Sequence, residues 1–437
     1  MLQQSAVAMG KMVRVGEISP AELLEAHRKQ IREINPRLNA VVALLDDAPV
    51  ESDGPLAGVP FSAKDSIDVR GVRTTAGTLE RRNAAAAEKD ATVVRRLRAA
   101  GGIPIAKTNL PDLLFAFESD NLIFGRSNNP YDLTRTPGGS SGGEAALIAA
   151  CGSPLGLGSD CLGSVRVPAA FCGIASIKPT SGRLPRTGHV PPASGWVEAL
   201  WQIGPMARHV EDLILAMRLL ASEDEDDFTS PPMPLVESKK RKDLRLAFFV
   251  DNGFARCSPE IVAAVRRCAE FLSQSGMLVE ERRPPGMDEA YELELALLGA
   301  DGVEGIGSTE VHPFLTHFVE QMRPHRASGA GLAKRWQQWD EYRRNLRRFF
   351  HEYDAILCPV YTQVALKHGD SILDENFRGF SYTMAWSVAG APAATVRCAS
   401  HEGLPVNVQI VAKPWDDMLA LEIARAIEER FGGWQPA

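Results

Sequence analysis

The chain has 437 residues, of which 45% are apolar and 24% charged, a composition typical of globular proteins that bury a large core. Its formal net charge of −7 argues against a nucleic-acid-binding surface, which needs an excess of basic residues. No apolar run is long enough for a membrane span, and residues 1–19 lack the apolar core of a secretion signal, so we expect a cytoplasmic protein without a membrane anchor.

The first hundred residues predict alternating helices and strands. Ser19-Pro20-Ala21-Glu22 is a helix start with a cap, a proline at the first helical position and an acid at the third. Alternation of helix and strand is typical of a doubly wound sheet covered by helices. The predicted elements are helices at 20–35 and 91–100 and strands at 39–44, 58–65 and 103–107.

The stretch from 137 to 179 is built around two serines. The glycine-serine loop at 138–143 precedes a segment, 144–150, whose only polar residue is a glutamate, which predicts a short helix buried on all sides. A strand follows. A helix of about nine residues advances ~14 Å and a strand of about seven ~23 Å. An antiparallel helix and strand would therefore bring Ser140 and Ser164 to one end of the unit.

The same stretch carries the motifs of a known family. The loop reads Gly-Gly-Ser-Ser-Gly-Gly, the turn after the strand reads Asp160-Cys161-Leu162-Gly163-Ser164-Val165-Arg166-Val167-Pro168-Ala169-Ala170, and Lys178-Pro179-Thr180 follows. Some forty residues in this order resemble the signature of the amidase signature family, and in particular that of fatty acid amide hydrolases. A lone Gly-Ser-Ser-Gly would be weak evidence, but this ordered set is specific.

The resemblance implies a Ser-Ser-Lys triad of Lys64, Ser140 and Ser164. Residues 60–65 match the Pro-x-x-x-Lys-[Asp/Glu] strand that carries the catalytic lysine of the family; without the resemblance, Lys64 would be read as an exposed lysine. Ser164 is then the nucleophile, Ser140 relays its proton, and Lys64 is the base, which requires burial to depress its pKa. The family also has a cis peptide bond before the residue that corresponds to Ser140.

The backbone N–H groups of Cys161, Leu162, Gly163 and Ser164 are the predicted oxyanion hole. The family usually has Gly-Gly before the nucleophile, where this chain has Leu162-Gly163. If that position needs a positive φ, leucine is strained there. Our hypothesis is that the oxyanion hole still forms with leucine at this position and that Leu162 narrows the substrate pocket.

The aromatic-rich stretch before the serine loop is either ordinary core or a substrate-pocket wall. The resemblance to fatty acid amide hydrolases implies that Leu114, Phe115 and Phe117 face the substrate, and we add Ser141 and Trp386 as candidate pocket residues. An apolar or aryl substrate suits such a lining better than a charged one.

The second half of the chain gives a weaker signal, and residues 280–330 predict little. The predicted elements are helices at 209–220, 259–275, 331–353 and 417–431 and strands at 244–250, 355–360 and 406–411. With no repeat and no second core visible, we expect one amidase domain over 1–437, with the signature core at 60–210 and a variable, substrate-shaping part at about 222–385. The resemblance implies an α/β fold with a central mixed, mostly parallel twisted sheet and helices on both faces.

The predicted activity is hydrolysis of a C–N bond of an amide, an anilide or a carbamate (urethane), or of an ester, through an acyl-enzyme. Seven cysteines form no CxxC pair and nine histidines show no metal spacing, so we expect no metal and no cofactor. The expected partner is a small-molecule substrate, and the expected state a monomer or homodimer. Two alternatives stay open: the glutaminase subunit of a tRNA-dependent amidotransferase, and a catalytically inactive relative with a binding role.

Overall fold

The computed structural model describes residues 1–437 except 49–51, 193–194, 238–242, 304–305 and 307–309. The strands are β1 (Val41–Leu44), β2 (Pro60–Lys64), β3 (Ile103–Thr108), β4 (Leu155–Asp160), β5 (Ala175–Lys178), β6 (Gln202–Ala207), β7 (Arg245–Phe248), β8 (Leu278–Glu281), β9 (Ala355–Pro359), β10 (Ala393–His401) and β11 (Leu404–Ala412). The α-helices are α1 (Ala6–Arg14), α2 (Pro20–Leu38), α3 (Thr92–Ala99), α4 (Gly142–Ala149), α5 (Arg166–Cys172), α6 (Val210–Leu220), α7 (Pro259–Gln274), α8 (Ala290–Leu298), α9 (Pro313–Met322), α10 (Gly329–Glu352), α11 (Asp374–Gly379), α12 (Ser381–Ala389) and α13 (Asp417–Phe431).

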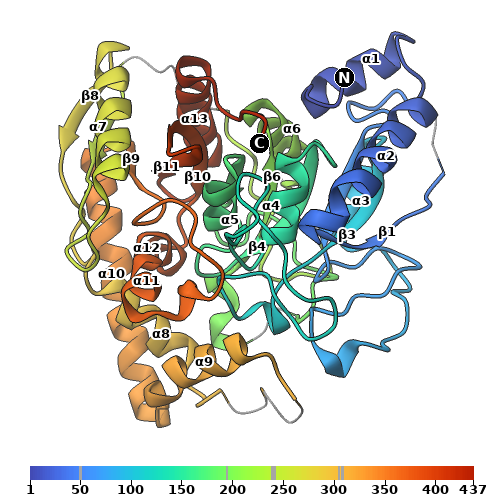
Figure 1. Ribbon diagram of the computed structural model, residues 1–437. Helices are drawn as coiled ribbons and strands as arrows, with labels where there is room; N and C mark the ends of the chain where they lie inside the picture. Colours follow the sequence, from blue (N-terminus) through green and yellow to red (C-terminus); the bar gives the residue numbers. More distant parts are fainter. Residues whose placement is uncertain (49–51, 193–194, 238–242, 304–305, 307–309) are drawn as a thin grey trace.

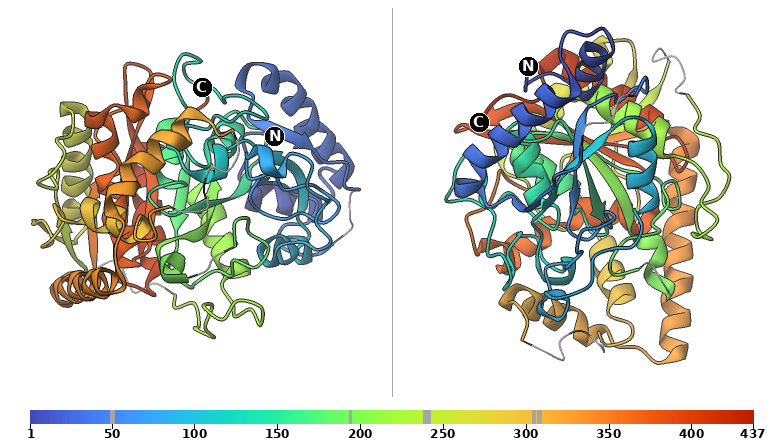
Figure 2. Two further views of the ribbon diagram at one scale, coloured as in Figure 1. Left: turned by 90° about the horizontal axis from the view of Figure 1, so that it is seen from below. Right: turned by 90° about the vertical axis from the view of Figure 1, so that its right-hand side faces the viewer.

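The described strands form one 11-stranded sheet in the order β1-β3-β2-β4-β6-β5-β10-β11-β9-β7-β8. Its two ends lie at opposite sides of the molecule, with the N-terminal helices beside β1 and the α7 region beside β8 (Figures 1 and 2). The expected α/β fold is confirmed.

The expectation of a mostly parallel sheet is wrong. Among the described strands, parallel pairs occur only in two outer groups, β3-β2-β4 and β9-β7-β8. The central strands from β4 to β9 pair antiparallel, as β1 does with β3. The alternation of helix and strand that suggested a parallel sheet describes the outer group containing β2 and β3. The central strands β5, β6 and β10 were not predicted, and they carry the antiparallel pairings.

Helices cover both faces of the sheet. One face packs against α3, α6, α7 and α13 in the largest apolar cluster of the protein. The other face packs against α4 and α5 near the middle of the sheet and against α8, α10 and α12 toward its β9 end. Figure 1 shows the long α10 along one side of the molecule, with α8 and α9 near its lower end. The candidate site lies on this second face.

Local signals explain the helices that the sequence predicted. In α2, Ser19 Oγ accepts from the N–H of Glu22 while the Glu22 carboxylate accepts from the N–H of Ser19, so the predicted cap closes reciprocally. Every residue of α4 is buried, as its apolar sequence predicted. Helix α13 begins and ends where the sequence predicted it.

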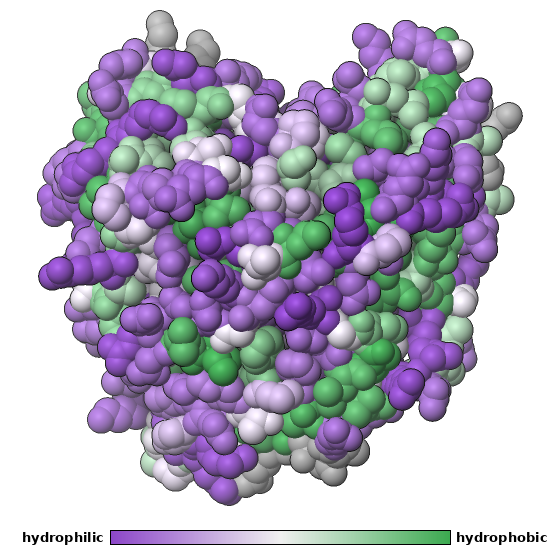
Figure 3. Space-filling model, viewed as in Figure 1, coloured by the Kyte–Doolittle hydropathy of each residue, from purple (hydrophilic) through white to green (hydrophobic). Residues whose placement is uncertain are grey.

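The surface seen in Figure 3 is largely hydrophilic, with hydrophobic residues in scattered groups and a notch at the top between the lobes that contain α7 and α1. Among the residues that the structure describes, none of the helices combines the length and the apolar character that crossing a bilayer requires.

Candidate active site

Lys64 ends β2 in the interior of the protein. Its side chain is fully buried, and its Nζ lies 2.7 Å from Ser140 Oγ and 3.2 Å from Ser159 Oγ. Neither neighbour carries a charge, so the amine meets hydroxyl groups where a buried ammonium usually meets a carboxylate.

The two predicted serines lie at one end of the α4–β4 unit. The N–H of Ser141 donates to the carbonyl of Ser164 at 3.0 Å, which holds the serine loop against the turn after β4. Ser140 and Ser164 both line one cavity of about 160 Å³. The Gly139–Ser140 peptide bond is cis, as the resemblance implied.

Burial sets the protonation of the amine. Desolvation lowers the pKa of Lys64 to about 7, against the opposing attraction of Asp160 and Glu144. Desolvation also raises the pKa of the buried Glu144 carboxyl to about 7, although Ser62 and Thr108 donate hydrogen bonds to it. At neutral pH a substantial fraction of Lys64 is therefore uncharged and has a free lone pair.

The turn that carries Ser164 is held by a buried ion pair. Arg166 Nη2 contacts Asp160 Oδ1 at 2.7 Å, and Arg166 Nε contacts Asp160 Oδ2 at 3.0 Å. The positive φ in this turn falls on Gly163, at 134°, and not on Leu162. The leucine that departs from the family pattern is therefore not strained in the way its position suggested.

The predicted oxyanion donors are not equivalent. The N–H of Gly163 already donates to Asp160 Oδ1 at 2.9 Å, because this bond closes the turn. The N–H groups of Cys161, Leu162 and Ser164 have no acceptor among the described residues, and all three residues line the cavity. These three remain as donors for a developing negative charge.

Helix α12 supports the turn from behind. Thr383 Oγ1 donates to the carbonyl of Leu162 at 2.5 Å and shares the same hydrogen with Phe380 O at 2.9 Å. Arg166 Nη1 donates to the carbonyl of Thr383 at 2.8 Å. A Cβ at Gly163 would lie 2.3 Å from Thr383 Oγ1, so this close approach requires glycine.

The cavity wall contains some of the predicted pocket residues. Leu114 and Phe115 line it. Phe117 stacks on Phe380 in the core, with ring centroids 3.4 Å apart, and Trp386 is fully buried against other apolar side chains. Ser141, within the serine loop, is buried, and its Oγ donates to Ser159 O. The aromatic stretch that contains Phe117 suited core and pocket wall equally well, and the structure places Phe117, Ser141 and Trp386 in the interior rather than among the described lining residues of the cavity.

Sequence reasoning missed several lining residues. These come from segments far apart in the chain: Leu113, Ser159, His189, Trp201 and Leu298. Ser159 was visible as the residue before Asp160 in the signature turn. The others carry no local signal, because their positions depend on how distant loops fold over the sheet.

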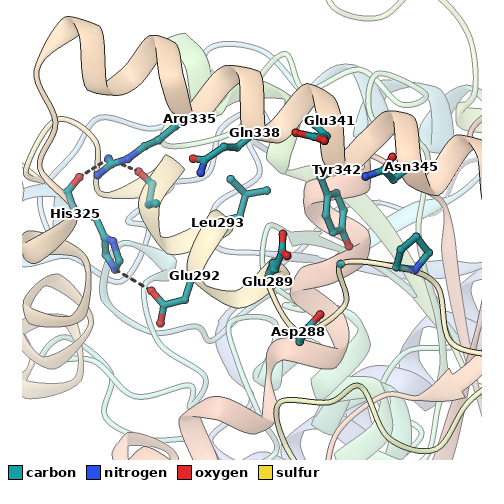
Figure 4. Close-up of a pocket in the computed structure, with 13 residues that line it drawn as sticks. Asp288, Glu289, Glu292, Leu293, His325, Arg335, Gln338, Glu341, Tyr342 and Asn345 are labelled. Atoms are coloured by element: carbon teal, nitrogen blue, oxygen red, sulfur yellow. Dashed lines mark hydrogen bonds and ion pairs between the residues drawn. The ribbon is translucent and has the colours of Figure 1, made fainter.

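A larger hollow of about 740 Å³ lies between α8 and α10 (Figure 4). Acidic side chains of both helices line it, including Glu292, whose carboxylate faces His325 Nε2 at 3.9 Å. It contains none of the predicted site residues, so the smaller cavity is the candidate active site. No group of three potential metal ligands occurs among the described residues.

Comparisons with known proteins agree with the geometry. The amidase family model matches residues 22–421. Fatty-acid amide hydrolase 2 of Homo sapiens is 29% identical over 99% of this chain and 90% of its own length, and indoleacetamide hydrolase of Bradyrhizobium diazoefficiens is 33% identical over 98% and 87%. The solved structure of 6-aminohexanoate cyclic dimer hydrolase superimposes with a TM-score of 0.90 at 27% identity, covering 99% of this chain and 97% of that one. The chain belongs to the amidase family.

Proposed function

We propose that the protein hydrolyses amides of small apolar acids through an acyl-enzyme on Ser164. The observation that carries the proposal is the buried Lys64 amine, which lies 2.7 Å from Ser140 Oγ, behind the cavity that Ser140 and Ser164 share, with no carboxylate of the described residues in hydrogen-bonding contact. A serine hydroxyl needs a base to attack a carbonyl at neutral pH, and an amine with a pKa of about 7 can supply one.

In the first half-reaction the bond from Ser164 Oγ to the substrate carbonyl carbon forms while the Ser164 proton passes to Ser140 and the Ser140 proton to Lys64. Charge develops on the carbonyl oxygen, for which the free N–H groups of Cys161, Leu162 and Ser164 are the donors. Collapse breaks the C–N bond, and the leaving nitrogen takes its proton from Ser140, which Lys64 reprotonates.

In the second half-reaction water attacks the acyl-enzyme. Its proton passes through Ser140 to Lys64 while the water oxygen bonds to the acyl carbon. The bond between Ser164 Oγ and that carbon then breaks, Ser164 takes a proton from Ser140, which Lys64 reprotonates, and the acid is released. Esters, anilides and carbamates fit the same scheme, because each offers an attackable carbonyl and a group that can leave.

The cavity supports a small apolar acyl group. Its volume of about 160 Å³ is close to that of apolar cavities that hold one benzene ring, about 150 Å³. Leucine, phenylalanine, proline and tryptophan side chains form much of its wall. Indoleacetamide hydrolase, one of the relatives, is named for an amide whose acyl group carries an aromatic ring system.

The glutaminase alternative is disfavoured by the same wall. Glutamine carries an ammonium and a carboxylate, which need charged partners in a buried site. Among the described lining residues the one carboxylate, Asp160, is already paired with Arg166.

The test is a screen of purified protein against arylacetamides, short aliphatic amides, p-nitroanilides, aryl carbamates and glutamine, with Ser164→Ala as the control. We expect turnover of at least one amide that Ser164→Ala abolishes. Turnover of glutamine alone would favour the glutaminase. No turnover together with no labelling of Ser164 by a fluorophosphonate would indicate the inactive relative.

A further inference from the structure

A chain of hydrogen bonds continues behind Lys64. Ser159 Oγ, 3.2 Å from Lys64 Nζ, lies 3.0 Å from His189 Nε2, and His189 Nδ1 lies 2.8 Å from the carbonyl of Pro191. A carbonyl only accepts, so Nδ1 carries the hydrogen. Because burial lowers the pKa of His189 to about 3, the ring is neutral and Nε2 is an acceptor. The hydroxyl hydrogen of Ser159 is therefore directed to His189.

This direction matters for the base. A neutral lysine amine has one lone pair, which must point at the hydroxyl hydrogen of Ser140 for the proton transfer. If Ser159 were free to rotate, its hydroxyl could donate into the same lone pair and compete with Ser140. With its hydrogen given to His189, Ser159 presents only oxygen lone pairs to Lys64 and accepts one of its N–H groups.

His189 is held firmly in this position. Its ring packs on Trp201, with centroids 4.3 Å apart, and the residue is only 4% exposed. The following residue, Val190, donates its N–H to Ser66 O at 2.7 Å, next to the strand that carries Lys64. The charged groups that act on the ring are Lys64, Arg186 and Lys107, and those that act on the lysine amine are Asp160 and Glu144.

We propose that His189 is a positioning residue that, through Ser159, keeps the lone pair of Lys64 directed at Ser140. The inference rests on the proposed function, since it assigns a role within that proton transfer.

The experiment compares His189→Phe with His189→Gln. Phenylalanine keeps a ring against Trp201 but offers no acceptor, whereas the side-chain oxygen of glutamine reaches the place of Nε2. We expect His189→Phe to lower kcat about tenfold, as the loss of one hydrogen bond of about 1.4 kcal/mol predicts, with little change in KM. We also expect the pKa of the acid limb of kcat/KM to fall, because the freed Ser159 hydroxyl stabilises the neutral amine. We expect His189→Gln to keep kcat and the pKa of the acid limb close to their wild-type values.

The inference would be overturned by a change in KM alone, by an unchanged pKa of the acid limb, or by an equal loss of kcat in both variants. Each of these results is expected if His189 only lines the cavity. Ser159→Ala supplies a second measurement: without the competing hydroxyl, adding His189→Phe should cost no further kcat, and an additive loss contradicts the proposal. If His189→Phe does not fold, His189→Asn replaces it, because its short amide cannot reach Ser159.

The wild-type protein separates this inference from the proposed function. Absence of turnover and of fluorophosphonate labelling at Ser164 removes both. Turnover that Ser164→Ala abolishes but His189→Phe leaves at the wild-type rate removes the inference alone.

Discussion

Two buried lysines on neighbouring strands have opposite surroundings. Lys107 of β3 contacts Asp65 at 3.1 Å and donates to the carbonyl of Ile67 at 2.7 Å, whereas the described residues offer Lys64 of β2 only hydroxyl groups within hydrogen-bonding distance. Both side chains are fully buried, and desolvation lowers the pKa of both. The ion pair supports a structural role for Lys107, and the lack of one supports the proposed role of Lys64 as a base.

The same substitution at the two lysines should separate these roles. Lys64→Met should lower kcat/KM at least 10²-fold, about the range of general-base catalysis, without loss of stability at pH 8. Lys107→Met leaves Asp65 buried without its cation and should cost about 3–5 kcal/mol of unfolding free energy. Urea unfolding and amide turnover measure both effects. Equal losses of stability, or an active Lys64→Met, would contradict the assignment.

The lowered pKa of Lys64 also predicts a pH dependence of stability. Between pH 7 and 10.5 the unfolded chain binds a proton at this lysine that the folded protein does not, so wild-type stability gains from rising pH in this window. Lys64→Met lacks this gain. Its stability relative to wild type should therefore fall by about 1.4 kcal/mol per pH unit from pH 7 upward. Parallel stability curves for the two proteins would show that the amine is charged when folded.

The individual residues that lie in sequence motifs could be predicted, but the residues that surround them in the fold could not. Lys64, Ser140 and Ser164 lie in ordered sequence patterns, and the cavity holds both serines with the lysine behind them. His189 and Trp201 occur in no pattern, because they reach the site only through the fold of the loop between β5 and β6.

Among the elements, α12 acts on the turn after β4 although more than 200 residues separate them in the chain. Its Thr383 holds the carbonyl of Leu162 and so orients the peptide groups of the oxyanion turn. The sequence did not predict α12, because polar and apolar residues mix around the helix without forming an apolar stripe. This mixture fits a helix that is buried throughout, as α12 is.

Thr383→Val removes that hydroxyl at nearly constant volume. We expect kcat/KM to fall about tenfold, less than the 10²–10³ that follows loss of an oxyanion donor, because the donors stay and only their orientation relaxes. The matched control is Thr395→Val, which loses a buried hydrogen bond of 2.9 Å between Thr395 Oγ1 and Ser176 Oγ. Neither residue is among the described lining residues of the cavity. Thr395→Val should lose similar stability and keep its activity. A control as impaired as Thr383→Val would remove the special role of the contact.

Across the whole molecule, elements with strong local patterns were predicted and the sheet order was not. Helix α2 follows from its cap and its apolar stripe, and α4 follows from its almost uniformly apolar sequence; α13 was predicted as well. Strand β5 has only four residues and β6 contains a glycine and a proline, so pairing with distant strands, rather than local sequence, makes them strands. Strand β10, which pairs with β5, was not predicted either. Without β5, β6 and β10, the antiparallel pairing at the centre of the sheet could not be predicted.

A leucine of the predicted variable part lines the cavity, and this predicts how specificity can be changed. Leu298, at the end of α8, lines the cavity, whereas Leu293 on the same helix lines the separate hollow of Figure 4. Leu298→Ala should raise the preference for two-ring over one-ring acyl groups about tenfold in kcat/KM, the scale of a few methylene groups in an apolar pocket. Leu293→Ala should leave the preference unchanged. The same shift in both variants would show that α8 loosened as a whole.

The central claim is that Ser164 becomes a nucleophile because a neutral Lys64 draws its proton away through Ser140. Its most direct measurement is the rate at which a fluorophosphonate labels Ser164, followed from pH 5 to 9 in wild type and in Lys64→Met, with the labelled peptide located by mass spectrometry. The account predicts a rate that rises through a pKa of about 7 and then levels, and that is at least about 10²-fold lower in Lys64→Met. A rate independent of pH, an equal rate in the variant, or a label on another residue would contradict it.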